Sequence, residues 1–355
     1  MRVAIVHDWL TVYAGAEKAL EQILNIFPKA DLFSVVDFFP DHLRSHLHGK
    51  KATTTFLQHF PLAKKLYRTY LPFMPMAIEQ LDVTGYDMVI SSSHAVAKGV
   101  ITAPGQRHLC YCYSPLRYAW DLQHQYLKGK KSPLARYVLH KMRLWDVRSS
   151  HGVDTFMAIS HFIAQRIEKC YRRHADVVYP PVAIEKFPLQ THKSDFYVTA
   201  SRLVSYKKID LIVDAFHMMP GRRLIVIGSG PEEKNLKKKI AANITFTGYL
   251  PLEKLADYLG RARAFVYAAL EDFGILPLEA QACGTAVIAF GAGGVKETCS
   301  ATGHFFKEQS AESICAAIEA FEKEKPISPV RCRQNAERFS EEHFREEFLK
   351  IISNL

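Results

Sequence analysis

The chain is poor in the patterns that assign a protein class at a glance. No apolar run approaches the roughly 20 residues of a membrane-spanning helix, which argues against an integral membrane protein. The first glycine turn, at Gly15, lacks the G-x-G-x-x-G spacing of a dinucleotide-binding loop. No Asp-x-Asp pair stands where a metal ion would bridge phosphates, so any phosphate chemistry is expected to be independent of metal.

Cysteine pairs with metal-ligand spacing are missing as well. Cys110 and Cys112 fall in an expected strand and share one face, where two core or cleft thiols are a simpler interpretation than half of a metal site. Without a disulfide framework, the sequence predicts a reduced, cytosolic compartment. Residues 1–8 are too short and too soon acidic for a signal peptide, so the protein is expected to be soluble or peripheral to a membrane.

What the chain does have is an uneven charge. The net charge is +10, and residues 1–180 carry 23 Lys and Arg against 14 Asp and Glu, whereas residues 181–355 carry 23 against 22. A basic first half predicts an anionic partner for that half. Segments 61–74 and 125–150 mix basic and apolar residues, which favours contact with an anionic membrane surface. The alternative is that both segments are ordinary solvated faces of the protein.

The length and the rhythm of the chain predict two α/β domains. At 355 residues the chain exceeds a usual single domain. In both halves, short apolar runs alternate with helical stretches, as in doubly wound parallel sheets. Pro180 and Pro181 form a linker between domains 1–180 and 181–339, and a last helix at about 340–355 is expected to pack back on the first domain.

Candidate residues of the first half follow its expected strands, where ligands of open α/β sheets bind. Gly15 follows the first strand and His94 follows the strand at 86–91, although a tight turn and an exposed loop would explain them equally simply. Segment 114–121 contains an Arg, a Tyr, a Trp and an Asp that suit a sugar by stacking and hydrogen bonding. The alternative is a helix that begins at Pro115.

The second half offers charged residues at strand ends. Arg202 and Lys207 share one strand-to-helix turn, where Arg can grip a pyrophosphate with two hydrogen bonds and Lys can add a point charge. Segment 271–279 joins a buried strand to a helix with Pro277 expected at its first position. A carboxylate therefore lies on each side of an anion-binding helix N-terminus, which suits a nucleotide sugar.

Four motifs in one order resemble a known family. Arg202-x4-Lys207, Gly228-x-Gly230, Phe246-x-Gly248 and Glu271-x7-Glu279 resemble the retaining glycosyltransferases of family 4, and the resemblance spans nearly the whole chain. Ala14-Gly15-Ala-Glu17 looks like that family's Gly-Gly-x-Glu loop, with Ala14 replacing the first glycine. The resemblance implies an α/β protein of GT-B fold, with two Rossmann-like domains facing a central cleft, an acceptor-binding first domain and a second domain that binds the nucleotide sugar.

The resemblance also implies roles for single residues. Arg202 and Lys207 would neutralise the leaving diphosphate, Glu279 would hold the ribose, and Glu271 would hold the donor sugar. His94 would lie beside the reacting sugar and completes the expected catalytic set with Glu271, Arg202 and Lys207. The other expected donor-site residues are Gly15, Gly228, Gly230, Phe246, Gly248, Tyr249, Phe273, Gly274 and Ile275. The acceptor-side candidates are Arg117, Tyr118, Trp120 and Asp121, and no metal or other cofactor is expected.

A narrower likeness concerns the substrates. Residues 91–99 and 114–121 look like bacterial mannosyltransferases of lipopolysaccharide O-antigen assembly. Those use GDP-mannose and act on lipid-diphosphate-linked saccharides at the inner face of the cytoplasmic membrane. The alternatives are a UDP-sugar-dependent enzyme of the same family and a nucleotide-sugar epimerase of the same fold, which would need an acid/base set. A nucleic-acid-binding protein would explain the pI of about 9.1, but no such module is visible.

Overall fold

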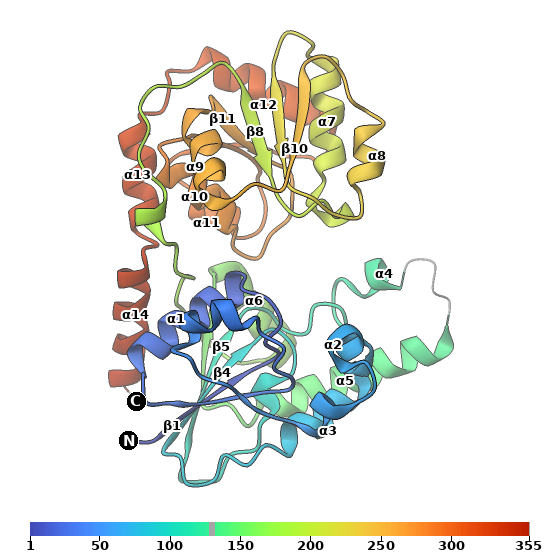
Figure 1. Ribbon diagram of the computed structural model, residues 1–355, viewed down its shortest axis with the longest axis vertical. Helices are drawn as coiled ribbons and strands as arrows, with labels where there is room; N and C mark the ends of the chain where they lie inside the picture. Colours follow the sequence, from blue (N-terminus) through green and yellow to red (C-terminus); the bar gives the residue numbers. More distant parts are fainter. Residues whose placement is uncertain (128–131, 355) are drawn as a thin grey trace. The chain divides into compact units, whose positions relative to one another are not determined.

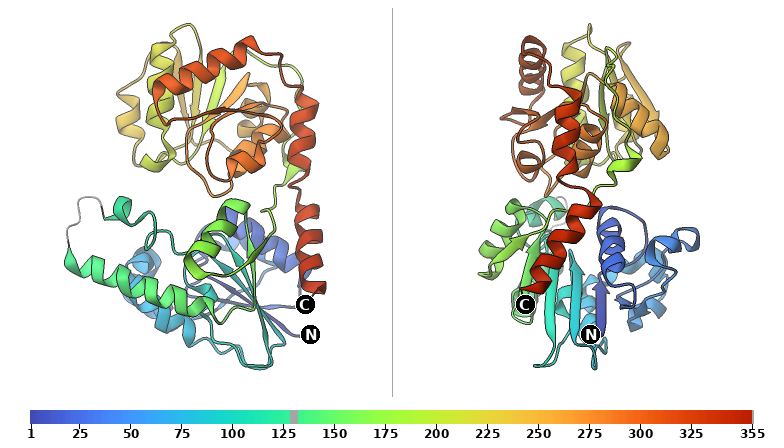
Figure 2. Two further views of the ribbon diagram at one scale, coloured as in Figure 1. Left: turned by 180° about the vertical axis from the view of Figure 1, so that it is seen from behind. Right: turned by 90° about the vertical axis from the view of Figure 1, so that its left-hand side faces the viewer.

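The computed structural model describes residues 1–127 and 132–354, and its chain forms two compact units (Figure 1). The N-terminal unit contains Met1–Tyr179 and the residues from Arg345 onward, and the C-terminal unit is Pro180–Phe344. The division falls at the double proline, one residue before the predicted boundary. Helices lie on both sides of the sheet within each unit (Figure 2).

The N-terminal unit has a parallel sheet of strand order β3-β2-β1-β4-β5-β6-β7. Its two central strands are buried at every position, including the three serines that end one of them. The strands are β1 (Val3–His7), β2 (Asp31–Ser34), β3 (Thr53–Thr54), β4 (Met88–Ser93), β5 (Arg107–Cys112), β6 (Thr155–Ala158) and β7 (Ala175–Val177). The α-helices are α1 (Gly15–Ile26), α2 (Ala63–Leu66), α3 (Met74–Glu79), α4 (Gln123–Tyr126), α5 (Pro133–Ser150) and α6 (His161–Tyr171). The 3-10 helices are η1 (Asp41–Leu47), η2 (Phe56–His59), η3 (Tyr67–Phe73) and η4 (Ala97–Gly99).

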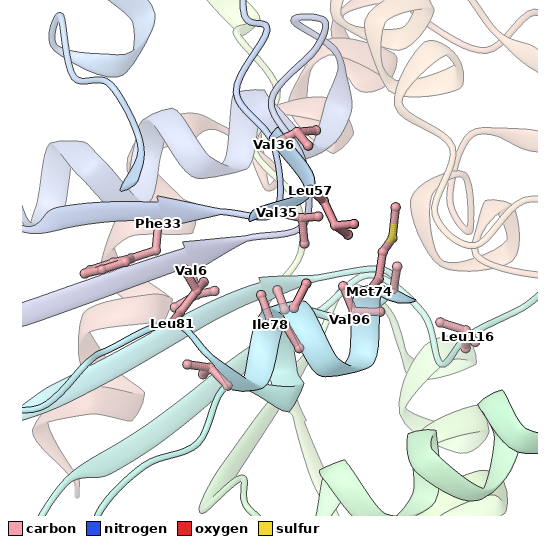
Figure 3. Close-up of a cluster of buried hydrophobic side chains, with 14 of the residues drawn as sticks. Val6, Phe33, Val35, Val36, Leu57, Met74, Ile78, Leu81, Val96 and Leu116 are labelled. Carbon is pink, nitrogen blue, oxygen red and sulfur yellow. The ribbon is translucent and has the colours of Figure 1, made fainter. Parts of the chain in front are cut away.

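One apolar cluster of the N-terminal unit lies between its sheet and the helices around α3. Val6 from β1, Phe33 from β2 and Ile78 from α3 are buried in it, together with Val96 and Leu116 from two loops (Figure 3). These loops follow β4 and β5. The core therefore fixes the two segments in which the sequence placed His94 and the acceptor-side candidates.

The C-terminal unit repeats the plan with the order β10-β9-β8-β11-β12-β13, again all parallel. Its strands are β8 (Tyr197–Ala200), β9 (Leu224–Ile227), β10 (Ile244–Gly248), β11 (Ala264–Tyr267), β12 (Val287–Phe290) and β13 (Gly303–Phe306). Its helices are α7 (Ile209–Met218), α8 (Glu233–Lys237), α9 (Leu252–Arg261), α10 (Ile275–Ala282), α11 (Val295–Thr298), α12 (Ala311–Lys323) and α13 (Pro329–Glu337), with the 3-10 helices η5 (Ile184–Lys186) and η6 (Ser205–Lys207).

The final helix, α14 (Glu341–Ser353), begins in the C-terminal unit and continues into the N-terminal one. Within the N-terminal unit, Arg345 Nη1 donates to Gln22 Oε1 on α1 at 2.5 Å, and the ring of Phe348 lies 6.0 Å from that of Tyr111 on β5. Residues from Arg345 onward therefore pack on the N-terminal unit.

Both sheets have a topological switch point, where the strand order reverses. It lies between β1 and β4 in the N-terminal unit and between β8 and β11 in the C-terminal unit. In open parallel sheets, the loops after two such strands diverge to opposite faces and leave a crevice for a ligand. Each unit therefore has one favoured binding position at the carboxyl edge of its sheet.

Several predicted elements differ from the structure. The serines 91–93 belong to β4 rather than to a turn, and residues 115–122 form turns instead of a helix that begins at Pro115. The strands β3, β7 and β13 were not predicted. All three are short edge strands with partly exposed residues, so they lack the apolar run of a central strand.

Two helix boundaries also need correction. The helix predicted from Pro277 begins at Ile275, because Gly274 caps it in a left-handed conformation (φ +95°). Pro277 is tolerated at the third position, since the first N–H groups of a helix have no partner within it. In the basic stretch that follows Gly230 and Pro231, where the sequence pattern is helical over 232–241, only Glu233–Lys237 forms a helix, with Leu236 as its buried residue. Because the lysines around Leu236 are exposed, this helix has few apolar side chains that can pack on the rest of the unit.

Candidate functional site

In the C-terminal unit, the predicted charged residues meet at the switch point. Lys207 ends the short η6 turn after β8, and Glu271 follows β11. The Lys207 ammonium forms an ion pair with Glu271 Oε1, and both side chains are mostly buried. The residues assigned to the diphosphate and to the sugar thus reach the same point.

Tyr267, the last residue of β11, adds a hydroxyl to this pair. Its oxygen lies 3.5 Å from Lys207 Nζ. Burial and the neighbouring Glu271 carboxylate raise the pKa of Tyr267 well above its usual range, so the phenol keeps its proton. Tyr267 has no functional signal in the sequence, because it reads as one more residue of an apolar strand.

The glycine motifs bring two loops of this edge together. A Cβ atom on Gly228 would lie 1.9 Å from the carbonyl oxygen of Ser201, and one on Gly230 would lie 2.4 Å from that of Leu203. Gly228 also has a φ of +130°, which L-residues rarely adopt. The loop after β9 can therefore lie directly against the loop that carries Arg202 and Lys207.

Close backbone contacts also hold the loop that precedes α10. Gly294 N donates to the carbonyl oxygen of Glu271 at 2.8 Å, and a Cβ on Gly294 would lie 2.4 Å from the carbonyl oxygen of Asp272. The turn through Phe273, Gly274 and Ile275 is thereby held in place. Its N–H groups open the first turn of α10, where the helix dipole favours an anion.

The remaining donor-site candidates lie at this edge with different exposure. Arg202 is exposed after β8, whereas Glu279 is buried as the fifth residue of α10. Phe246 packs partly on the core from β10, and Gly228 N donates to the carbonyl oxygen of Gly248 at 2.8 Å. Tyr249 is 78% exposed beyond this strand.

In the N-terminal unit, the switch point holds Asp8 and His94. The Asp8 carboxylate is fully buried and accepts hydrogen bonds of 2.6–3.0 Å from the four consecutive N–H groups of residues 94–97. Its Oδ2 also lies 2.8 Å from Nδ1 of His94. Burial alone would raise the pKa of Asp8, but His94 and the backbone donors hold that pKa well below its usual range.

A second buried network joins β1, β4 and α1. His7 Nδ1 lies 3.0 Å from Ser92 Oγ, which lies 2.9 Å from the hydroxyl of Tyr113. The Tyr113 hydroxyl donates to the carbonyl oxygen of Ala16, and Glu17 Oε2 accepts from Ala14 N. The loop that leads into Gly15, the first residue of α1, is therefore tied to β4, the strand that precedes His94.

His7 and Glu17 close this network. His7 Nε2 lies 3.6 Å from Glu17 Oε1, and both side chains are buried. Burial favours the neutral acid, yet the interaction with His7 lowers the pKa of Glu17. Glu17 is therefore held as a carboxylate beside the imidazole.

Two of the four acceptor-side candidates have their polar groups engaged within the unit. Trp120 Nε1 donates to Asp146 Oδ2 at 2.7 Å, and Asp121 forms an ion pair with Arg166. Arg117 and Tyr118 are half-buried in the same turns. An acceptor role for this segment rests on the sequence alone.

The remaining sequence features concern the second basic segment, the cysteines, metal binding and membrane crossing. The lysines at 128, 130 and 131 of the second basic segment lie outside the described residues. Cys110 and Cys112 are buried free thiols, as expected of core residues. Within residues 1–127 and 132–354, no group of three or more His, Cys, Asp or Glu side chains is arranged to hold a metal ion. None of the described helices is long and apolar enough to cross a bilayer.

The chain is similar to known glycosyltransferases. Residues 167–339 match a family described as glycosyl transferases group 1. The GDP-mannose-dependent monoacylated alpha-(1-6)-phosphatidylinositol monomannoside mannosyltransferase of Corynebacterium glutamicum is 30% identical in an alignment of 183 residues that covers 42% of this chain and 48% of that protein. The glycogen synthase of Pseudomonas aeruginosa is 30% identical in an alignment of 172 residues that covers 43% of this chain and 32% of that protein. The chain spans about half the length, or less, of these curated relatives.

Solved structures agree with the whole fold. Alr3699/HepE of Anabaena, in complex with UDP, has a TM-score of 0.74 at 18% identity, and the alignment covers 100% of both chains. Sucrose-phosphate synthase of Thermosynechococcus elongatus has a TM-score of 0.72 at 17% identity, covering 100% of this chain and 99% of that one. These similarities confirm the predicted fold, in which two Rossmann-like units follow each other along the chain.

Proposed function

Residues 167–339 belong to the glycosyl transferases group 1 family within a chain of GT-B fold, and we propose that the protein is a retaining glycosyltransferase. The observation that carries this proposal is the ion pair of Lys207 with Glu271 at the switch point of the C-terminal unit. A cation and a carboxylate at one point, beside the N–H groups that open α10, suit a ligand with both phosphates and hydroxyls.

The proposed reaction needs charge stabilisation more than acid/base chemistry. The acceptor oxygen forms a bond to the anomeric carbon on the face from which the diphosphate leaves, so the configuration is retained. The bond between that carbon and the phosphate oxygen breaks, and the departing oxygen takes the acceptor proton. Lys207 and Arg202 stabilise the charge on the diphosphate, while Glu271 orients the sugar hydroxyls and Glu279 the ribose. These cations would replace a divalent metal.

The proposed donor is GDP-mannose. The name of the Corynebacterium relative specifies GDP-mannose and mannosyl transfer, which supports this choice for the part of the chain that matches it. A UDP-sugar is the second candidate, because the Anabaena structure holds UDP on the same fold. The base of either nucleotide would lie near the segment from Phe246 to Tyr249.

The proposed acceptor is a lipid-linked saccharide of bacterial surface polysaccharide, such as O-antigen, reached at the inner face of the cytoplasmic membrane. Basic and apolar residues are exposed together in the N-terminal unit, which supports contact with an anionic surface. Leu62, beside Lys64 and Lys65, is 66% exposed, and Leu134 at the start of α5 is 70% exposed. Co-sedimentation with phosphatidylglycerol vesicles, but not with phosphatidylcholine vesicles, is expected. Equal recovery with both would contradict the contact.

A transfer assay with the purified chain tests the reaction and the donor together. With a lipid-linked saccharide as acceptor, labelled mannose is expected to move from GDP-mannose, in EDTA as in buffer, and the product should keep the α-configuration. Transfer from UDP-glucose alone would replace the donor. Activity that EDTA removes and magnesium restores would contradict metal independence, and no transfer from either nucleotide sugar would contradict the function itself.

A further inference from the structure

We propose that Asp8 is the positioning residue of His94: it fixes a proton on Nδ1 and leaves Nε2 as the ring nitrogen offered to a substrate hydroxyl. The inference rests on the proposed function, in which His94 contacts the substrate. It assigns a role to a carboxylate for which the sequence motifs offered none. Asp8 is 86 residues away from His94 in the chain and directly beside it in the fold.

The position of the proton follows from charge and distance. Asp8 Oδ2 lies 2.8 Å from His94 Nδ1, a close charge contact in which Nδ1 does not reach full hydrogen-bond geometry. Four backbone N–H groups also point at this carboxylate, so it is stable as an anion. An imidazole lone pair facing an anion at that distance would be repelled. Nδ1 therefore carries a hydrogen, and in the neutral ring Nε2 is the acceptor.

The imidazole is held by its surroundings as well as by Asp8. The ring of Trp9 meets it edge-on, with centroids 4.5 Å apart and an angle of 85° between the planes. Nδ1 is buried, whereas the side chain as a whole is 30% exposed, so its exposed part lies away from Nδ1. This geometry presents the opposite side of the ring to a ligand at the carboxyl edge of the sheet.

The neighbouring network makes the arrangement rigid. His7, next to Asp8 in β1, lies 3.0 Å from Ser92 Oγ in β4 and 3.6 Å from the Glu17 carboxylate in α1. The ring centroids of His7 and His94 are 6.3 Å apart. Strands β1 and β4 are thus joined by side chains next to the Asp8 contacts, and the orientation of His94 does not depend on its contact with Asp8 alone.

A simpler role for Asp8 is to hold the backbone of residues 94–97 without acting on the imidazole. The two roles differ in what they predict for the ring. If Asp8 only shapes the loop, the neutral His94 ring is free to carry its hydrogen on Nε2, the form that is usual in water. If Asp8 positions the ring, the hydrogen is on Nδ1.

Nitrogen-15 NMR of the wild-type chain, labelled at histidine, distinguishes them without any variant of Asp8. The His94 signals are identified by their loss in His94→Asn, and the tautomer is read from the two ring nitrogen shifts over the pH range in which the ring is neutral. A hydrogen on Nδ1 is expected. A hydrogen on Nε2 would overturn the inference, whatever the enzymatic activity is.

A double-mutant cycle connects the contact to turnover. Asp8→Asn is expected to lower kcat about 10- to 100-fold, as for the loss of a hydrogen bond to a charged group. The same change in a His94→Ala background should have no further effect, because the ring it positions is gone. An equal loss in both backgrounds would reduce Asp8 to a loop-holding role and overturn the inference.

Ser93→Ala is the matched control in this cycle. Ser93 Oγ accepts from Lys98 N at 3.3 Å, so this change removes a different side-chain contact to the same loop. It should leave kcat near that of the wild type, and a loss as large as that of Asp8→Asn would count against a specific role of Asp8. Full turnover by His94→Ala would instead contradict the substrate contact of the proposed function. If Asp8→Asn does not fold, the tautomer of the wild type still decides.

Discussion

The two units share a strand order but build their switch points differently. In the C-terminal unit, glycines let loops approach within contact distance, and one ion pair, Lys207 with Glu271, supplies the charge. In the N-terminal unit, buried polar side chains fill the corresponding place, with Asp8 and His7 at the end of β1 and His94 after β4. The first arrangement leaves backbone groups and charges for a ligand, and the second holds one imidazole in a fixed position.

In the proposed reaction, the C-terminal unit would bind the nucleotide diphosphate and the N-terminal unit would position the reacting sugar. A nucleotide diphosphate needs N–H groups, cations and room for its own backbone contacts, which the glycine loops provide. A reacting sugar needs a few groups placed accurately, which a buried network achieves because its members hold one another. The comparison can be tested by removing the central group of each arrangement.

The largest expected effect is on turnover through the C-terminal switch point. Glu271→Gln and Lys207→Met each leave the other partner mostly buried and remove a charge that the donor needs. Each should lower the rate of sugar transfer about 100- to 1,000-fold with an unchanged circular dichroism spectrum. Asp214→Asn is the control. Asp214 on α7 pairs at 2.7 Å with Lys239, which follows α8. Near-full turnover in either test variant would show that the pair is not the donor site.

The next largest effect is on the free energy of unfolding. It compares a buried polar contact of the N-terminal unit with a partly exposed one of the C-terminal unit. Asp146 is buried and accepts from Lys98, Trp120 and Tyr171, so Asp146→Ala leaves a buried ammonium uncompensated and should cost about 3–5 kcal/mol. In the C-terminal unit, Glu322 pairs at 2.7 Å with Arg222, whose side chain is 28% exposed.

Glu322→Ala is therefore expected to cost only about 1 kcal/mol. Urea unfolding followed by circular dichroism measures both changes. Equal losses for the two variants would mean that burial does not distinguish the polar contacts of the two units.

The sequence singled out charged residues of the C-terminal switch point but not Asp8 of the N-terminal one, for a physical reason. Lys207 and Glu271 are charged residues in the loops that follow apolar strands, and a cation and a carboxylate in such loops indicate ligand binding without knowledge of pairing. Asp8 had no such signal. Its partners are 86–89 residues further along the chain, and only the pairing of β1 with β4 brings them together.

Errors in the predicted fold have a similar origin. Helix α10 began earlier than predicted because the conformation of Gly274, rather than Pro277, sets its start. The acceptor-side role of Trp120 stays a prediction, and the structure adds that its indole N–H donates to Asp146, which is 26 residues away. Residue type and spacing thus located the edge of each sheet, but they did not show which polar groups already had partners within the fold.

A smaller effect is expected from acid on the N-terminal unit. The pKa of Asp8 is lowered in the folded state, so the unfolded chain takes up a proton first as the pH falls. The stabilisation from ionised Asp8 is therefore complete above about pH 5 and decreases below about pH 4, the usual range of an unfolded Asp. The difference in free energy of unfolding between the wild type and Asp8→Asn should shrink over that range. Glu17→Gln should behave alike, and a difference that is constant with pH would contradict the account.

The smallest effect is expected from alkali on the C-terminal unit. Burial lowers the pKa of Lys193 to about 8, below the usual value of 10.5. Between these values the unfolded chain binds more protons at this residue, so its contribution to stability rises with pH. The stability of the wild type relative to Lys193→Met should therefore increase from pH 8 to pH 10. A decrease over that range would show that the ammonium is stabilised by its carbonyl partners at Gly260 and Cys283 more than it is destabilised by burial.

Nucleotide binding tests the central claim most directly, because it does not depend on an acceptor. Calorimetry should show that the full chain binds GDP without metal and that Lys207→Met weakens binding at least about tenfold, as expected for a lost contact to a charged group. Lys239→Met removes a lysine of the same unit that pairs with Asp214 on α7, and this variant should bind GDP like the wild type. Equal affinity of the wild type and Lys207→Met for GDP would contradict the assignment of the C-terminal switch point as the nucleotide-sugar site.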